Sequence, residues 1–166
     1  MYSSISSYRY MFTYINTVFQ CEEPKLQKLS LAGCDLSLED GNLLVRLPYF
    51  ATRLQTLDLS SNPQFEQPIL LQLLQNASSN AECALEQIVM IDCGISSPLT
   101  SDLLDSLGNK LSATIPLVKL HFSCVKLDTV DQNSLKQVWC GHWGDLAVCN
   151  FHKGDIVQLS VRNNVY

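Results

Sequence analysis

Charge is scarce in this sequence. Asp, Glu, Lys and Arg make up 16% of its 166 residues, whereas about a quarter is typical of globular chains. The net charge is −5, from 16 acidic and 11 basic residues, and no run of basic residues occurs. Binding to duplex DNA or RNA depends on clustered Lys and Arg that replace condensed counterions. The sequence therefore excludes a duplex nucleic-acid binder, and its low charge suggests that other groups cover part of its surface.

The sequence also lacks the marks of secreted and membrane-spanning chains. Its seven cysteines are odd in number and include no CxxC pair, which argues against a disulfide scaffold and for a reducing compartment, the nucleus or the cytoplasm. The start, MYSSISSYRYMFTYINTVFQC, has one Arg, and Thr13, Asn16 and Thr17 interrupt its apolar run. This is a poor signal peptide and too short to span a bilayer. We expect neither secretion nor membrane binding.

Signatures of catalysis are missing as well. No glycine-rich phosphate loop occurs, and Gly33 and Gly94 are interpreted as turn residues. Among the three histidines, His121 stands three residues before Cys124, which is a conceivable nucleophile and base. An open sheet, however, offers no enclosed pocket that would exclude water from such a pair. The sequence predicts no enzyme and no cofactor.

One group of residues is a candidate metal site. Cys140, His142, Cys149 and His152 are four ligands that zinc accepts, within thirteen residues. Their spacing, C-x-H followed by C-x-x-H, is not a familiar zinc pattern. We favour the alternative, an aromatic cap in which the cysteines pack as small hydrophobic side chains, and expect no metal.

What the sequence does contain is a repeated spacing of apolar residues. In LQTLDLSSN, residues 54–62, leucines stand at offsets 0, 3 and 5 and an asparagine at offset 8, and the pattern recurs from Leu26, Leu85 and Leu117. Offsets 3 and 5 lie on the same side of a strand, so both point into a core. The offset-8 residue is expected to turn inward and to satisfy buried backbone groups. These residues are Cys34, Asn62, Cys93 and Val125; valine has no polar group, which predicts a looser or differently bonded fourth corner.

A helical segment is expected after each strand. Ser37 and Asp40 predict the start of a helix in 37–50, which Pro48 disrupts. Pro68 fits the first turn of the next helix, and Pro98 is expected to do the same in 96–111. The last segment is 128–139. The residues expected to face inward are Leu43, Leu44, Leu47, Ile69, Leu70, Leu73, Leu74, Leu103, Leu104, Leu107, Leu111, Val130, Leu135, Val138 and Trp139.

This pattern resembles the leucine-rich repeat of the ribonuclease-inhibitor-like class, LxxLxLxx(N/C)xL followed by a helix. The resemblance implies an α/β solenoid, a short horseshoe with an inner parallel sheet and outer helices. The organisation would be an atypical N-terminal segment (1–25), four repeats (26–127), and a C-terminal capping helix with a final strand (128–166). That fifth strand would place Ile156, Leu159 and Val161 inward. Residues 1–25 either cover the first repeat or, as we favour, mark the terminal piece of a longer array.

The outward positions of the strands form the candidate partner-binding surface. Val89 and Ile91 are apolar where solvent is expected, and they predict an apolar spot flanked by Asp58 and Lys119, as at protein hot spots. The alternative is that a loop or the tail covers them. The surface as predicted comprises Lys28, Ser30, Thr56, Asp58, Gln87, Val89, Ile91, Lys119 and His121, and its expected ligand is a protein on the concave face.

The ending SLKQVWCGHWGDLAVCNFHKGDIVQLSV is similar to the extreme C-terminus of Tonsoku-like proteins. This resemblance implies the C-terminal leucine-rich part of a nuclear scaffold, which acts in recombination repair of double-strand breaks at replication forks and docks partners on its repeat surface. Two other hypotheses stay open. One is a cytosolic binder or inhibitor of the ribonuclease-inhibitor type, and the other is an adaptor for a different signalling complex.

Overall fold

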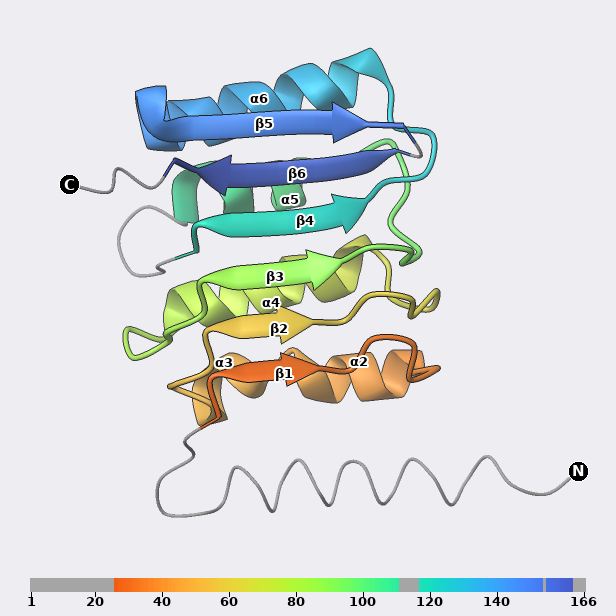
Figure 1. Ribbon diagram of the computed structural model, residues 1–166, viewed down its shortest axis with the longest axis vertical. Coiled ribbons are helices and arrows are strands. Elements are labelled where there is room, and N and C mark those ends of the chain that lie inside the picture. The colour runs from red at the N-terminus through yellow and green to blue at the C-terminus, as the bar shows by residue number, and fades with distance from the viewer. Residues whose placement is uncertain (1–25, 111–116, 154, 163–166) are drawn as a thin grey trace, which may run out of the picture.

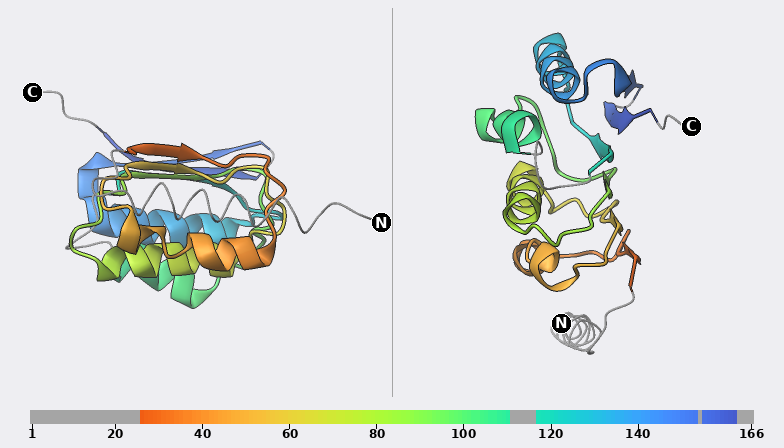
Figure 2. Two further views of the ribbon diagram at one scale, coloured as in Figure 1. Left: turned by 90° about the horizontal axis from the view of Figure 1, so that it is seen from below. Right: turned by 90° about the vertical axis from the view of Figure 1, so that its left-hand side faces the viewer.

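The computed structural model describes residues 26–110, 117–153 and 155–162 (Figure 1). It is a mixed α/β structure with one open sheet in the order β1-β2-β3-β4-β6-β5. The helices form a second layer on one face of that sheet (Figure 2). The strands are β1 (Lys28–Ser30), β2 (Thr56–Asp58), β3 (Gln87–Met90), β4 (Lys119–Ser123), β5 (Ala147–His152) and β6 (Ile156–Val161). The helices are α2 (Leu38–Leu44), α3 (Leu47–Phe50), α4 (Gln67–Ser79), α5 (Ser101–Asp105) with the π-helical η1 (Ser106–Lys110), α6 (Thr129–Trp143) and the short 3₁₀ turn η2 (Gly144–Leu146).

The four leucine-patterned segments lie side by side in one parallel ladder, as predicted. Leu29 pairs with Leu57, Leu57 with Ile88, and Ile88 with Leu120. All four residues stand at offset 3 of the repeated pattern, so equal offsets meet across the sheet. The last three are completely buried, and burying one such side chain contributes about 1.5–3 kcal/mol. The repeated spacing thus places the offset-3 residues of neighbouring strands side by side in one continuous core.

Local sequence signals set where the helices begin. Ser37 and Asp40 form a reciprocal capping box at the start of α2, in which each side chain accepts a hydrogen bond from the other residue's backbone N–H. Pro68 lies in the first turn of α4, where a missing N–H costs nothing because that group has no helical partner. Ile69, Leu70, Leu73 and Leu74 are buried as expected.

Some inward positions were predicted wrongly. Val130 is 68% exposed, because it lies in the first turn of α6 on the side away from the sheet. Leu43 is only half-buried, whereas the half-buried Leu104 and Val138 pack against the core as predicted. Pro98 precedes its helix instead of opening it: the Ser97–Pro98 peptide bond is cis, and α5 begins at Ser101 with Thr100 as its N-cap. Leu111 lies outside the described residues.

The corner residues at offset 8 follow the prediction in two of the four segments. Asn62 is completely buried; its side chain accepts a hydrogen bond from the Leu36 N–H at 3.0 Å and donates to the carbonyl oxygens of Leu31 (3.0 Å), Leu59 (2.8 Å) and Ser60 (3.1 Å). The Cys93 thiol is buried and donates to the Leu59 oxygen at 3.4 Å. The amide of Asn62 therefore links the first two segments to each other.

The first and fourth corners differ from this arrangement. Cys34 is exposed, contrary to the prediction. It belongs to β1's segment, which lies at the edge of the described sheet, so no earlier described segment packs beside it. In the fourth segment Cys124 is buried in place of Val125, whose side chain is 49% exposed. The Val125 backbone instead pairs with Ile95 and Ser97, at 2.8 and 2.9 Å. This corner is differently bonded, as expected from the missing polar side chain.

The C-terminal part corrects the prediction of an all-parallel sheet. The expected final strand, β6, runs antiparallel to β4, and a strand that was not predicted, β5, pairs antiparallel with β6 at the sheet edge. Because β6 begins at Ile156, alternation along the strand turns Ile156 to the opposite face from Val157, Leu159 and Val161. Val157 and Leu159 are buried and Val161 packs against the core, whereas Ile156 is only half-buried. Trp139 of α6 is completely buried and donates its ring N–H to the Ser160 oxygen at 3.0 Å. The expectations for 1–25 lie outside the described residues.

Replacing Asn62 with alanine tests the corner. The change leaves the Leu36 N–H and the backbone oxygens that Asn62 contacts without their partner, and an unsatisfied buried polar group costs about 1–3 kcal/mol. We expect Asn62→Ala to lower the free energy of unfolding by about 3 kcal/mol in urea denaturation. Asn133→Ala, at an exposed position of α6, is the control and should change it by less than about 0.5 kcal/mol. Equal effects of the two variants would contradict the role given to Asn62.

Candidate functional site

The face of the sheet that carries no helix is the candidate site, and we call it the open face. In Figure 2 the strands follow a shallow bend, and the open face lies on the inner side of it. Alternate residues of each strand point to this face because side chains alternate along a strand. Its members on the paired strands are Lys28, Ser30, Thr56, Asp58, Gln87, Val89, Lys119, His121, Ser123, Val148, Asn150, His152, Ile156, Gln158 and Ser160. Ile91 follows directly after β3.

Strand register aligns the members of the open face in rows across all six strands. The central row runs Ser30, Asp58, Val89, His121, Gln158 and Asn150. A second row begins with Lys28, Thr56, Gln87 and Lys119 and continues to Ser160 and Val148. The structure therefore brings together the predicted residues of four separate segments.

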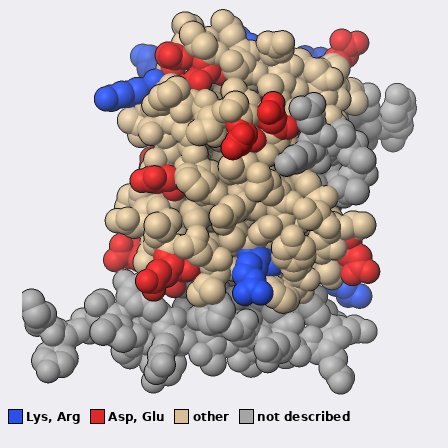
Figure 3. Space-filling view, turned by 180° about the vertical axis from the view of Figure 1, so that it is seen from behind, with Lys and Arg blue, Asp and Glu red and all other residues tan. Residues whose placement is uncertain are grey.

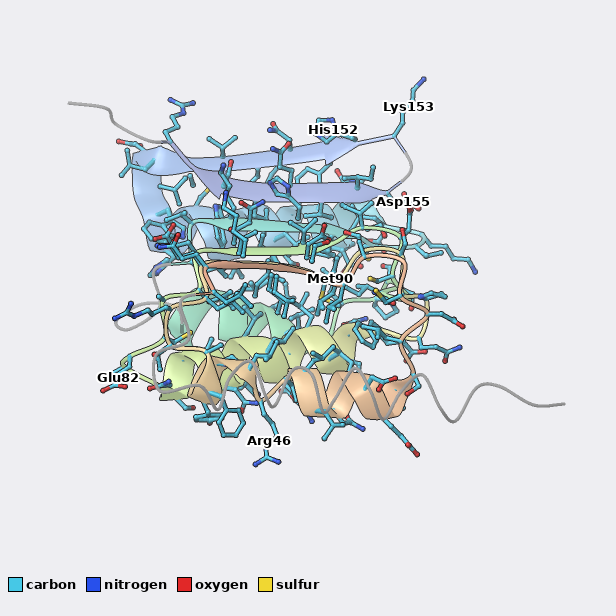
Figure 4. The ribbon with its side chains drawn as sticks, turned by 60° about the horizontal axis from the view of Figure 1, so that its bottom comes forward. Arg46, Glu82, Met90, His152, Lys153 and Asp155 are labelled. Carbon is cyan, nitrogen blue, oxygen red and sulfur yellow. The ribbon has the colours of Figure 1, made fainter. Side chains whose placement is uncertain are left out.

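The β5–β6 hairpin adds residues that the sequence analysis missed. Asn150 and Gln158 extend the central row, and the His152 ring lies 3.2 Å from the Gln158 side-chain oxygen. Figure 4 shows His152 at the end of β5, beside the turn that carries Lys153 and Asp155. Asp155 ties this turn to the end of β4, because its side chain accepts a hydrogen bond from the Lys126 N–H at 2.9 Å. The alternation in AVCNFH was the signal that could have revealed β5.

Asp58 is held in place on the open face. Its carboxylate accepts hydrogen bonds from the Ser30 hydroxyl at 3.3 Å and from the Ser60 N–H at 3.0 Å. One partner comes from the neighbouring strand and the other from the residue two positions further on. A fixed carboxylate presents its remaining acceptor positions in a defined direction, which favours selective contact with a donor on another molecule.

The apolar spot of the open face consists of Val89 and Ile91, and strand register defines its neighbours. Val89 and Ile91 are half-buried, and the Ile91 N–H donates to the Ser60 hydroxyl at 3.1 Å. The residues paired with Val89 are Asp58 and His121, whereas Lys119 pairs with Gln87. Val89 thus separates a carboxylate from an imidazole.

His121 is half-buried, and its ring atom Nε2 is buried without a hydrogen-bond partner among the described residues. Burial lowers the pKa of His121, and the positive charge of Lys119 lowers it further. The ring is therefore neutral at pH 7. A neutral imidazole carries one donor and one acceptor nitrogen, and because Nε2 is buried, the rest of the half-buried ring is what faces a partner.

Cys124 and His121 do not form a nucleophile–base pair. Cys124 is completely buried on the core side, whereas His121 lies on the open face. Burial raises the pKa of Cys124 to about 12, with a further contribution from the charges of Asp131, Asp155 and Asp128. Because the thiolate is the reactive form, this buried thiol is inert at neutral pH.

The four candidate metal ligands are likewise not brought together. Cys149 lies on the core side of β5, whereas His152 lies on the open face. The His142 ring packs edge-on against Trp143, with 4.7 Å between the ring centres. In the part of the chain that the structure describes, no group of three or more His, Cys, Asp or Glu side chains has the arrangement needed for a metal ion. Cys140 and Cys149 alone are in contact with each other.

Comparison with known proteins gives one informative similarity. The Tonsoku-like protein of Danio rerio is 32% identical to this chain over 114 residues, which is 69% of the chain and 8% of that protein. The chain therefore spans less than a tenth of the length of this relative. No protein-family model matches the sequence, and no solved structure matches it. Within 26–110, 117–153 and 155–162, no helix is both long and apolar enough to cross a membrane.

The environment of His121 predicts a dependence of stability on pH. Because folding lowers the pKa of His121, the unfolded chain binds the proton more readily, and the stability present above about pH 6.5 is lost as the pH falls through the folded-state pKa. We expect the free energy of unfolding to fall more between pH 7.5 and pH 5.5 in the wild type than in His121→Gln, as measured by urea denaturation at both values. An equal fall in the two proteins would contradict this account of His121.

Proposed function

We propose that this chain is a non-enzymatic protein-interaction module which binds a protein partner through the open face. The observation that carries the proposal is the central row. It places an apolar residue, Val89, between the fixed carboxylate of Asp58 and the half-buried, neutral ring of His121. An apolar centre with oriented polar neighbours is the usual composition of a protein–protein hot spot.

The module is further proposed to be a short leucine-rich-repeat solenoid. Four segments with the same apolar spacing pair in equal register, each strand is followed by a helix on the same side of the sheet, and buried Asn62 and Cys93 occupy the corners. In this proposal 26–127 is the repeat region and 128–166 is its C-terminal cap. Helix α6 and the hairpin would cover the apolar end of the fourth repeat, as terminal units of solenoids must.

The helix side is the competing surface, and it is less suited to specific binding. Figure 3 shows that this side is mostly uncharged, with scattered acidic and basic residues. Its exposed aromatic residues have partners within the chain: the Tyr49 hydroxyl lies 3.4 Å from the Asn76 oxygen, and the Arg46 guanidinium carbon lies 5.6 Å from the centre of the Phe50 ring. Val130 is exposed, and exposed apolar side chains are common on protein surfaces.

For the cellular role, we propose a nuclear scaffold related to Tonsoku-like proteins, which acts in recombination repair of double-strand breaks at replication forks. The support is the similarity to the zebrafish protein over 69% of the chain, together with the C-terminal helix and hydrophobic strand. The repeats would dock repair partners in such a scaffold. A binder of the ribonuclease-inhibitor type is the second candidate; Asp58 is the one carboxylate among the described members of the open face, which is little for an acidic inhibitory surface.

A matched pair of valine substitutions separates the two surfaces. Val89→Asp adds a charge beside Asp58 on the open face, and Val130→Asp makes the same change on the helix side. We expect proximity labelling in cells to enrich nuclear replication and recombination proteins with the wild type and with Val130→Asp, and to lose them with Val89→Asp. Loss of one hot-spot side chain lowers affinity by roughly thirty-fold.

Two controls keep this experiment decisive. Lys119 is exposed, so Lys119→Glu should fold normally and still weaken binding, whereas Val89→Asp is followed by thermal denaturation to confirm that it folds. Equal labelling by the wild type, Val89→Asp and Lys119→Glu would contradict binding at the open face. Stoichiometric inhibition of a ribonuclease by the purified chain would favour the second candidate over the repair scaffold.

A further inference from the structure

Two free cysteines meet where the C-terminal helix packs on the edge strand. Cys140 lies in the last turn of α6 and is exposed, and Cys149 lies on the core side of β5 and is half-buried. The two side chains are neighbours, because Cys140 acts directly on the Cys149 thiol. The other described cysteines differ from this pair: Cys83, Cys93 and Cys124 are buried, and the exposed Cys34 thiol points to the Ala32 oxygen.

A second contact between the same two elements supports this placement independently. The Lys136 ammonium lies 5.4 Å from the centre of the Phe151 ring. Lys136 precedes Cys140 by one helical turn, so both lie on the same side of α6. Phe151 follows Cys149 by two residues, so both lie on the same side of β5. The packing that brings Lys136 onto Phe151 therefore also brings Cys140 onto Cys149.

We propose that Cys140 and Cys149 are a redox modification site, at which a peroxide converts the two thiols into a reversible disulfide. In the first step the Cys140 sulfur attacks the peroxide oxygen, the O–O bond breaks, and water leaves as sulfenic acid forms. In the second step the Cys149 sulfur attacks the Cys140 sulfur, the S–O bond breaks, and a second water leaves. The two thiols lose two electrons and two protons in total, and the peroxide is reduced to water.

The surroundings assign a different step to each cysteine. Burial raises the pKa of Cys149 to about 11, and the neighbouring Cys140 thiol adds to that effect. Cys149 therefore stays protonated at neutral pH, and Cys140, which solvent reaches, is the thiol that meets the oxidant first. The positive charge of Lys136 acts in the opposite direction on Cys149, and it stabilises the negative charge that develops on this sulfur in the second step.

The disulfide would join α6 to β5 through a short loop. Helix α6 supplies the buried Trp139, which hydrogen-bonds to Ser160 of β6, so the bridge would fasten the helix to both strands of the hairpin. Closing a loop of roughly ten residues removes entropy from the unfolded chain. Oxidation would thus stabilise the C-terminal end of the sheet, where Asn150 and Gln158 complete the central row.

Peptide mapping of the oxidised protein tests the proposal. The reduced full chain is treated with hydrogen peroxide, its remaining thiols are alkylated, and it is digested with trypsin. Both cysteines fall in the single tryptic peptide 137–153, between Lys136 and Lys153. We expect this peptide to be lighter by two hydrogens, to be free of alkylation, and to regain both thiols with dithiothreitol. The intact oxidised protein should have a Tm about 5 °C above that of the reduced protein.

Serine variants supply the controls. Cys149→Ser should abolish the lighter peptide and the rise in Tm, whereas Cys34→Ser, which removes an exposed cysteine away from the pair, should leave both unchanged. Cys140→Ser changes an exposed side chain and tests the pair again in case Cys149→Ser destabilises the fold. Alkylation of both cysteines in 137–153 under conditions that already oxidise Cys34 would overturn the proposal, as would the lighter peptide persisting in either pair variant.

Discussion

The in-register pairing of Leu57, Ile88 and Leu120 is the constraint on which the rest of the structure depends. A slip of one residue between two parallel strands would turn every side chain of one strand to the opposite face. The leucine side chains would then meet solvent, and Val89 would enter the core. The completely buried amide of Asn62 reinforces the register, because it hydrogen-bonds to backbone groups of the first two segments at once. The strand register therefore determines both which residues form the core and which residues form the open face.

The C-terminal hairpin extends this arrangement by different means. It continues the open face with Gln158 and Asn150, and it presents Val157 and Leu159 to the core, yet its strands run antiparallel. An antiparallel hairpin needs only a short turn, and here Asp155 fastens that turn to the end of β4. The candidate binding surface thus combines a repeated part, which the leucine spacing builds, with an end-specific part that supplies polar side chains. The proposed disulfide acts on this second part alone.

The sequence predicted the structure correctly where a local residue pattern is compatible with only one conformation or orientation. Alternating leucines can face only one core, Ser37 followed by Asp40 forms a capping box, and Pro68 fits the first turn of a helix. It failed where contacts between segments that are distant in the sequence decide which side chains face the core. Leu159 and Val161 contact the core as predicted, but Ile156 lies within β6, where alternation places it on the opposite face and Val157 is buried instead. At the fourth corner, Cys124 took the inward position expected of Val125. The pairing of Val89 with His121 comes from strand register, which the sequence alone does not provide.

Nuclear Overhauser contacts between backbone protons of neighbouring strands test the central claim most directly. The account predicts cross-strand contacts in the register that pairs Leu57 with Ile88 and Ile88 with Leu120, together with slow amide exchange along β3. A register in which Leu57 is paired with Val89 would contradict it. Val89 would then share the core side with the leucines, and neither the single apolar interior nor the open face would exist as described.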